Sequence, residues 1–238
     1  MRIPLSLQGY KKGTSFMIKL QDIWKEYRID KEITFAALKH INLTIDKGEF
    51  VGVVGPSGCG KSTLMYLIGL LDKPTKGSIL IDGKDISGLS DDEISSLRNS
   101  FFGFVFQQFN LINKLTVLEN ILLPTVYASV KLDYDPLEKA MDLIDKFGLK
   151  DKKNSYPNKI SGGQQQRVAI ARALIMHPEC ILADEPTGNL DSKTGEGILN
   201  LLSELNKEEK ITIIVVTHDP HVAKRTKKTI KMVDGEIV

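Results

Sequence analysis

The stretch Val51-Gly-Val-Val-Gly55-Pro-Ser-Gly-Cys-Gly60-Lys61-Ser62-Thr63 decides the fold. Its central part, Gly55–Ser62, matches the pattern G-x-x-x-x-G-K-[S/T] and lies between an apolar strand and a helical run, Thr63–Leu70. In this pattern the glycines let backbone N–H groups turn toward one anion, and the N-terminus of the helix adds partial positive charge. The stretch therefore predicts a site for the phosphates of a nucleotide.

Two side chains of this loop add chemistry of their own. Lys61 brings a full positive charge to the β- and γ-phosphates, and Ser62 supplies a hydroxyl to Mg²⁺. A glycine-rich turn that merely connects strand to helix is the alternative, but the eight-position pattern is much more specific than an isolated glycine motif. The residues expected to contact the nucleotide are Gly55, Pro56, Ser57, Gly58, Cys59, Gly60, Lys61, Ser62 and Thr63.

Composition narrows the class of protein. The 238 residues suffice for one large domain or two small ones, and 42% apolar with 26% charged residues is typical of a water-soluble globular chain. A net charge of +2 argues against a protein that coats nucleic acid. No apolar run reaches the ~20 residues of a membrane span. Cys59 and Cys180 lack metal-ligand spacing, which favours a reducing cytosol.

Strand patterns alternate with helix patterns along much of the chain, which predicts a parallel α/β core. The expected strands are Leu38–Ile45, Glu49–Val54, Gly77–Ile81, Phe102–Phe106, Cys180–Ala183, Ile211–Thr217 and Thr229–Val233. The expected helices after the loop are Val117–Val130, Pro136–Phe147, Gly163–Met176 and Ser192–Asn206.

The strand signals stop between Gln107 and His177, so this block is expected to be a helical insertion, 107–177, in a core made of 17–106 and 178–238. Pro178 supports its end, because a helix rarely continues into a proline. Residues 1–16 carry no strand or helix pattern and are expected to be a leader outside the main domain, 17–238.

Carboxylates and a histidine follow two of the expected strands. Asp184 and Glu185 end the run Ile181–Ala183, and His218 follows the strand that ends at Thr217. Because ligands bind at the carboxyl ends of parallel strands, Asp184 is expected to hold Mg²⁺ and Glu185 to polarise the attacking water. Solvated turn carboxylates and a structural histidine are the alternatives.

A second potential anion site begins at Ser161, where serine, Gly162, Gly163 and Gln164 open a helix. On its own this is a well-capped helix. A chain with one phosphate loop does not obviously need two anion sites, but the second makes sense if it covers the nucleotide of another copy.

Together these motifs resemble the ATPase subunits of ABC transporters, from Met17 to nearly the end of the chain. The motifs occur in the family's order: Gly55–Ser62, Gln107, Ser161–Gln164, Asp184-Glu185, Asn189–Asp191 and His218. The lipoprotein-releasing and macrolide-exporting branch is closest, on the stretches Gly103–Leu111, Leu115–Asn120, Ser161–Ile170 and Ala183–Gly195. The resemblance implies a P-loop NTPase (RecA-like) parallel sheet with an N-terminal antiparallel β subdomain and an inserted helical subdomain.

The resemblance also implies roles for single residues. Tyr27 would stack on adenine, although an ordinary tyrosine at a strand end is the alternative. Gln107 would contact Mg²⁺ and the attacking water, with Gln108 as the competing choice. Glu185 would be the general base and His218 would contact the γ-phosphate. Asp191 would cross to the other subunit.

Two chains of this family pair head to tail, so Ser161, Gly162 and Gly163 of one would close over ATP held by Lys61 of the other. The implied partner is an integral-membrane permease that docks on the helical insertion, with no nucleic acid, and the implied location is the cytoplasmic side of the membrane. The apolar patch Phe109, Leu111, Ile112 and Leu115 is the expected dock. The main alternative is an ATP-dependent switch that gates a membrane partner, as in the regulation of cell-wall hydrolases, without transport. DNA-repair and translation ABC proteins need more chain than 238 residues.

Overall fold

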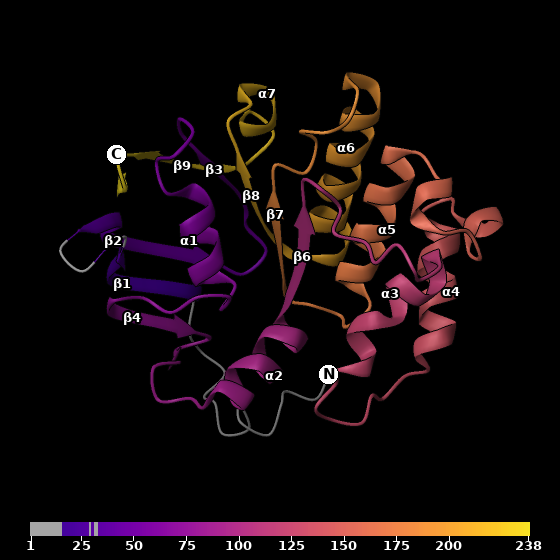
Figure 1. Cartoon of the computed structure of the whole chain (residues 1–238), viewed down its shortest axis with the longest axis horizontal. Coiled ribbons are helices and arrows are strands. Elements are labelled where there is room, and N and C mark those ends of the chain that lie inside the picture. The colour runs from indigo at the N-terminus through magenta and orange to yellow at the C-terminus, as the bar shows by residue number, and fades with distance from the viewer. Residues whose placement is uncertain (1–15, 29, 31–32) are drawn as a thin grey trace.

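A computed structural model describes residues 16–28, 30 and 33–238. Within these residues the larger sheet has the strand order β10-β9-β3-β8-β7-β6. All neighbouring pairs from β9 to β6 are parallel, and only the β9–β10 pair is antiparallel. The predicted parallel α/β core is therefore confirmed (Figure 1). The strands are β3 (Phe50–Val54), β6 (Phe102–Phe106), β7 (Cys180–Asp184), β8 (Thr212–Thr217), β9 (Lys228–Val233) and β10 (Glu236–Ile237).

The second sheet of the described chain is antiparallel, in the order β2-β1-β4-β5. Its strands are β1 (Phe16–Arg28), β2 (Thr34–Asp46), β4 (Lys76–Ile81) and β5 (Lys84–Asp85). This sheet confirms the antiparallel β subdomain. Phe16 pairs with Asp46 in the first strand, so the sheet begins inside the range assigned to a leader, and residues 1–15 of that range lie outside the described residues.

Between Gln107 and His177 all regular secondary structure is helical, as the sequence predicts. The helices of the described residues are α1 (Lys61–Ile68), α2 (Asp91–Phe101), α3 (Val117–Val126), α4 (Pro136–Lys146), α5 (Gly162–Leu174), α6 (Ser192–Glu209) and α7 (Pro220–Ala223), with 3₁₀ turns at Lys150–Lys152 and Pro157–Lys159. In the described part of the chain, none of them has the length and apolar character that crossing a bilayer would require.

Helix α2 is absent from the elements expected from the sequence, although a signal for it exists. Ser90 and Glu93 form a capping box at its start, in which the Ser90 hydroxyl accepts from the Glu93 N–H and the Glu93 carboxylate accepts from the Ser90 N–H. Serine followed three residues later by glutamate is a helix-start pattern that the sequence displays openly.

Apolar side chains cover both faces of the parallel sheet. Leu182 and Ile214 belong to one buried cluster together with side chains of β1, β2 and α1. Ile181 and Ile213, one residue earlier on the same strands, belong to another cluster formed with α3, α4, α5 and α6. Successive strand residues point to opposite faces, so unbroken apolar strands are what a doubly covered sheet requires.

The strand register brings the predicted motifs to one edge. Val54 lies beside Thr217, Asp184 beside Val216, and Phe106 beside Asp184. The loops after β3, β8, β7 and β6 therefore leave the sheet at the same end, toward which the arrows of β6, β7 and β8 point in Figure 1. This shared edge positions the candidate site.

Candidate active site

The phosphate loop connects β3 to α1 by a conformation that needs glycine. Gly60 caps α1 with a φ of 100°. A Cβ at this position would approach the carbonyl oxygen of Ala37 to 2.6 Å, closer than real Cβ atoms come. Pro56, Ser57 and Gly58 are exposed, so the middle of the loop is open to a ligand at the N-terminus of the helix.

Lys61 points back into this loop. Its Nζ donates to the carbonyl oxygens of Gly55 at 2.9 Å and Pro56 at 2.8 Å, and Cys59 Sγ lies 4.0 Å away. The side chain is buried, with 8% of its surface exposed. All three contacts are to neutral groups, so no carboxylate among them competes with an anion for the ammonium. The loop therefore combines a lysine charge with the helix N-terminus.

Ser62 and Asp184 form the oxygen pair predicted to hold Mg²⁺. The Ser62 hydroxyl donates to Asp184 Oδ1 at 3.5 Å across the gap between α1 and β7. Burial raises the pKa of Asp184, and the hydrogen bond from Ser62 opposes that shift. Mg²⁺ is commonly bound by one or two protein oxygens together with phosphate and water, so this hydroxyl and carboxylate fit the ion.

Glu185 faces a different way from Asp184. Its Oε1 accepts from the His218 backbone N–H at 3.0 Å and lies 2.5 Å from His218 Nδ1, while its Oε2 accepts from the Thr217 hydroxyl at 3.0 Å. The backbone of Glu185 adopts a φ of 44°, which is unfavourable for a residue with a Cβ. These contacts hold the carboxylate at the shared edge, next to the phosphate loop.

Gln107 follows β6 and contacts the loop after β7. Its amide Nε2 donates to Asn189 Oδ1 at 3.3 Å, and Asn189 Nδ2 donates to the Gln107 carbonyl at 3.0 Å. The neighbouring Gln108 is exposed. The structure thus joins Gln107 to the segment that leads to Asp191, a contact that the sequence analysis did not foresee.

Tyr27 lies near the end of β1, with 39% of its surface exposed. Its hydroxyl donates to Asp72 at 2.9 Å, and the Thr63 side chain also interacts with it. Because Thr63 directly follows Ser62, the tyrosine lies beside the first turn of the phosphate-binding helix.

Ser161 and Asp191 both cap helices. The Ser161 hydroxyl accepts from the Gln164 N–H at 3.3 Å, and the Gln164 side chain accepts from the Ser161 N–H at 3.0 Å, which completes a capping box. Asp191 accepts from the Thr194 N–H at 3.0 Å at the start of α6, and the hydrogen bonds from Thr194 lower its pKa. Both side chains are exposed, so both remain accessible to a second molecule.

The phosphate-binding helix α1 and the serine-capped helix α5 lie on opposite faces of the parallel sheet. Leu64 of α1 packs in the cluster on one face, and Val168 of α5 packs in the cluster on the other. Within one chain the parallel sheet therefore separates α1 from α5, as Figure 1 also shows. A ligand between them would have to be shared by two chains.

The apolar patch predicted from Phe109, Leu111, Ile112 and Leu115 is only partly exposed. Ile112 is exposed, at 43%, whereas Phe109, Leu111 and Leu115 are half-buried and Leu111 packs against the core cluster. The loop after β6 folds back onto the helical block, where Arg172 donates to the carbonyls of Phe109 and Asn110, and the docking role of the patch stays a prediction.

A hollow of about 700 Å³ lies instead between α2, β6 and α3. Its lining includes Arg98, Phe104, Tyr127 and Arg172, and Tyr127 is 69% exposed. The sequence analysis missed it because its walls come from segments far apart in the chain.

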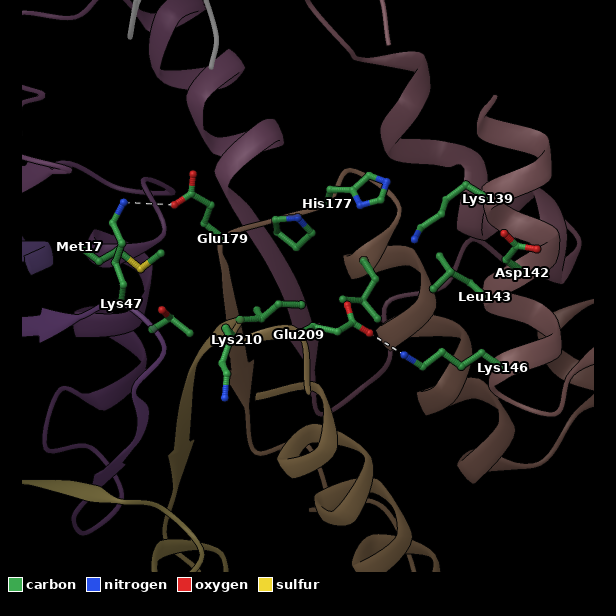
Figure 2. A pocket seen from close by; sticks show the side chains of 14 residues that line it. Met17, Lys47, Lys139, Asp142, Leu143, Lys146, His177, Glu179, Glu209 and Lys210 are labelled. Atoms are coloured by element: carbon green, nitrogen blue, oxygen red, sulfur yellow. Dashed lines mark hydrogen bonds and ion pairs between the residues drawn. The ribbon is translucent and has the colours of Figure 1, made fainter. Parts of the chain in front are cut away.

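Another hollow, of about 400 Å³, lies at the opposite end of the strands (Figure 2). Its lining includes Thr212, the first residue of β8. Ion pairs join Lys47 to Glu179 at 3.7 Å and Lys146 to Glu209 at 2.5 Å in its wall. Its position at the far end of the strands separates it from the phosphate chemistry.

Comparisons with known proteins agree with this geometry. The family described as "ABC transporter" matches residues 38–188. The uncharacterized ABC transporter ATP-binding protein YvrO of Bacillus subtilis is 51% identical over 93% of this chain and 96% of its own. A macrolide export ATP-binding/permease protein, MacB of Bartonella henselae, is 51% identical over 95% of this chain, which spans 34% of that protein.

A solved structure is similar throughout. It is a dimeric, post-hydrolysis state of the ATP-binding cassette MJ0796, a Methanocaldococcus jannaschii protein, bound to ADP and Pi. The TM-score is 0.85 at 48% identity, with coverage of 93% of this chain and 96% of that one. The resemblance drawn from the motifs is confirmed.

Proposed function

The chain belongs to the ABC transporter family as an ATP-binding cassette that hydrolyses ATP to ADP and phosphate, and from that premise we propose that it powers an exporting permease of the lipoprotein-releasing or macrolide-exporting kind. The observation that carries the proposal is the convergence of Lys61, Asp184 and Glu185 at one sheet edge. The identity to macrolide export proteins supports the branch.

In the proposed mechanism each residue of the edge has one task. Lys61 and the N-terminal N–H groups of α1 bind the phosphates, and Ser62 and Asp184 would hold Mg²⁺. When bound, Mg²⁺ neutralises charge on the β- and γ-phosphates. Glu185, held by Thr217 and His218, accepts a proton from the attacking water. His218 would contact the γ-phosphate, and Gln107 would contact the metal and the water.

The site is completed by a second copy of the chain. Ser161, Gly162 and Gly163 of the partner would lie over the γ-phosphate, and Asp191 would cross the interface. Two observations support this arrangement: α1 and α5 cover opposite faces of the sheet, and the MJ0796 cassette is dimeric. ATP binding closes the dimer and hydrolysis reopens it, and this cycle would drive the permease.

We place the docking of the permease in the hollow between α2, β6 and α3, with the cassette peripheral on the cytoplasmic side of the membrane. The hollow touches the helical block and β6, the strand that leads directly to Gln107. Movement of Gln107 would therefore be transmitted to a permease segment bound there. The exposed ring of Tyr127 offers the apolar contact expected of an interface.

Reconstitution in vesicles with the membrane protein that co-purifies with the chain tests the proposal. The proposal expects ATP-dependent movement of a lipoprotein or a macrolide across or out of the bilayer, abolished by Lys61→Ala. ATP hydrolysis coupled to a membrane partner without any moved substrate would instead support a switch, such as a regulator of cell-wall hydrolysis.

A further inference from the structure

The ring of Tyr27 is held by a small array of charged side chains outside the phosphate loop. We propose that Asp72 and Lys25 are positioning residues that fix the Tyr27 ring for stacking on the nucleobase and so set the KM for ATP. This inference rests on the stacking role of Tyr27 in the proposed function.

Asp72 receives three donors. Its Oδ2 accepts from the Tyr27 hydroxyl at 2.9 Å, and its Oδ1 accepts from Lys25 Nζ at 2.6 Å and from the Lys73 backbone N–H at 2.7 Å. Both carboxylate oxygens are therefore engaged, and the carboxylate cannot rotate without breaking a bond. The tyrosine hydroxyl is tied to a fixed point on the loop after α1.

Lys25 holds the ring from one side. Its Nζ also donates to the Lys73 carbonyl at 2.8 Å, and only 11% of its side chain is exposed. The ammonium lies over the Tyr27 ring, 4.9 Å from the centroid. Lys25 and Tyr27 are two residues apart on β1, so their side chains project from the same side of the strand. One face of the ring is thus occupied by the cation, which leaves the other for a base.

The ionisation of the array supports a fixed hydrogen bond. Burial and then the bond to Asp72 raise the pKa of Tyr27, so the phenol remains a donor. Burial also pushes the pKa of Asp72 upward, but the hydrogen bonds from Lys25, Lys73 and Tyr27 outweigh it and lower that pKa overall. At neutral pH the phenol is protonated and the carboxylate ionised, as a strong charge-assisted bond requires.

The array is attached to the same helix as the phosphate site. Thr63, in the first turn of α1, interacts with the Tyr27 hydroxyl, and the loop after this helix carries Asp72. The Leu71 N–H bonds to the Tyr66 carbonyl, which fastens that loop to the helix end. The distance between the base platform and the phosphates is thereby set by α1. None of these contacts involves Glu185, so the array acts on binding of the base and not on hydrolysis.

Five variants of the chain test the proposal by steady-state kinetics with ATP and with GTP. Asp72→Asn keeps the shape of the side chain but offers one acceptor oxygen to three donors. Tyr27→Phe keeps the ring and removes the hydroxyl. The double variant, which carries both changes, completes a double-mutant cycle. Asp91→Asn is the matched control, because Asp91 pairs with Lys73 at 2.7 Å in the same region and is not bonded to Tyr27.

Each single change at Tyr27 or Asp72 is expected to raise the KM for ATP by about three- to tenfold, as expected for one lost hydrogen bond, with kcat within about twofold. The double variant should be no worse than the single ones, because both remove the same bond. The preference for ATP over GTP should fall in parallel, whereas inhibition by inorganic tripolyphosphate, which has no base, should be unchanged. Asp91→Asn should leave all these values unchanged.

Tyr27→Ala distinguishes the stacking role of Tyr27 from the positioning role of Asp72. If it leaves the KM for ATP unchanged, the stacking role itself is wrong. If it raises the KM while Asp72→Asn and Tyr27→Phe do not, stacking stands and the positioning role of Asp72 is overturned. Additive effects in the double variant, or a loss confined to kcat, would also overturn it.

Discussion

The N-termini of α1 and α5 are both built to meet an anion, and they differ in how much of a site each carries. At α1, Lys61 lies inside the loop and Ser62 contacts Asp184, so charge, N–H donors and metal ligands are present in one chain. At α5 the stretch Ser161–Gln164 has no cationic side chain, and its serine already caps its own helix.

The difference agrees with the proposed function, in which α1 would bind a nucleotide and α5 would complete a site whose nucleotide another chain binds. An anion at α5 alone would have only the helix terminus, which is worth far less than a terminus combined with a lysine. The sheet between the two helices prevents them from meeting in one chain. Variants at each terminus should therefore fail in different ways.

Lys61→Ala should have the largest effect. Removing the only lysine of the phosphate loop should lower ATP turnover by at least about a hundredfold, because transition-state charge loses its main counterion. Phosphate release by the purified chain measures this. Near-normal ATP turnover by this variant would contradict the assignment of the phosphate site to α1.

Gly162→Ala should break the α5 side without disturbing the single chain. A Cβ at Gly162 would meet Leu190 and Phe109 at ordinary contact distances of 3.5 and 3.6 Å. The added methyl should nevertheless crowd the nucleotide of the second copy and weaken ATP-driven dimerisation by about tenfold, or 1.4 kcal/mol.

Gly197→Ala is the matched control, because Gly197 is exposed on α6 and a Cβ there meets nothing within 4 Å. Analytical ultracentrifugation at several protein concentrations measures both variants. Equal dimerisation of the Gly162 and Gly197 variants would contradict a role for α5 in the partner's site.

Asn189→Ala should have a smaller effect, on the link between the two sides. Asn189 is bonded to both the side chain and the carbonyl of Gln107, so its loss frees the glutamine. We expect kcat to fall by about three- to tenfold, the size of one or two lost hydrogen bonds, with nucleotide affinity retained. A fall in affinity with an unchanged kcat would mean that Asn189 serves binding instead.

Ser161→Ala and Ser90→Ala compare the loss of a helix cap at α5 with the same loss at α2, and their expected effects are the smallest. Both serines accept an N–H at 3.3 Å in a capping box, so each change should reduce the free energy of unfolding by about 1 kcal/mol in urea titrations. Only the Ser161 variant should also weaken the ATP-driven dimer. If the Ser90 variant weakens it equally, the effect is one of stability and not of a shared site.

Much of the fold and the phosphate side of the site could be predicted from the sequence. Local patterns were sufficient where the chemistry is local, as in the loop from Gly55 to Ser62, and the parallel register then brought Asp184, Glu185 and His218 to the same edge. Helix α3, for which the sequence predicts an end at Val130, ends at Val126, where the N–H groups of Tyr127 and Ala128 bond three residues back and tighten the last turn.

Tertiary packing accounts for what the sequence could not show. The exposure of Leu111 depends on how a loop folds onto a distant cluster, and no periodicity reports that. The hollow lined by Arg98, Phe104 and Tyr127 exists only once α2, β6 and α3 are assembled. The contact of Tyr27 with Asp72 likewise joins residues that are 45 positions apart.

The most direct test of the shared site is the mass of the Glu185→Gln chain in solution. This change removes the general base while keeping the side-chain shape, so ATP should bind and remain uncleaved. Light scattering with saturating ATP and Mg²⁺ should give twice the 26.5 kDa mass of the chain, and the added change Gly162→Ala should return it toward 26.5 kDa. A variant that binds ATP and yet stays at 26.5 kDa would contradict the account.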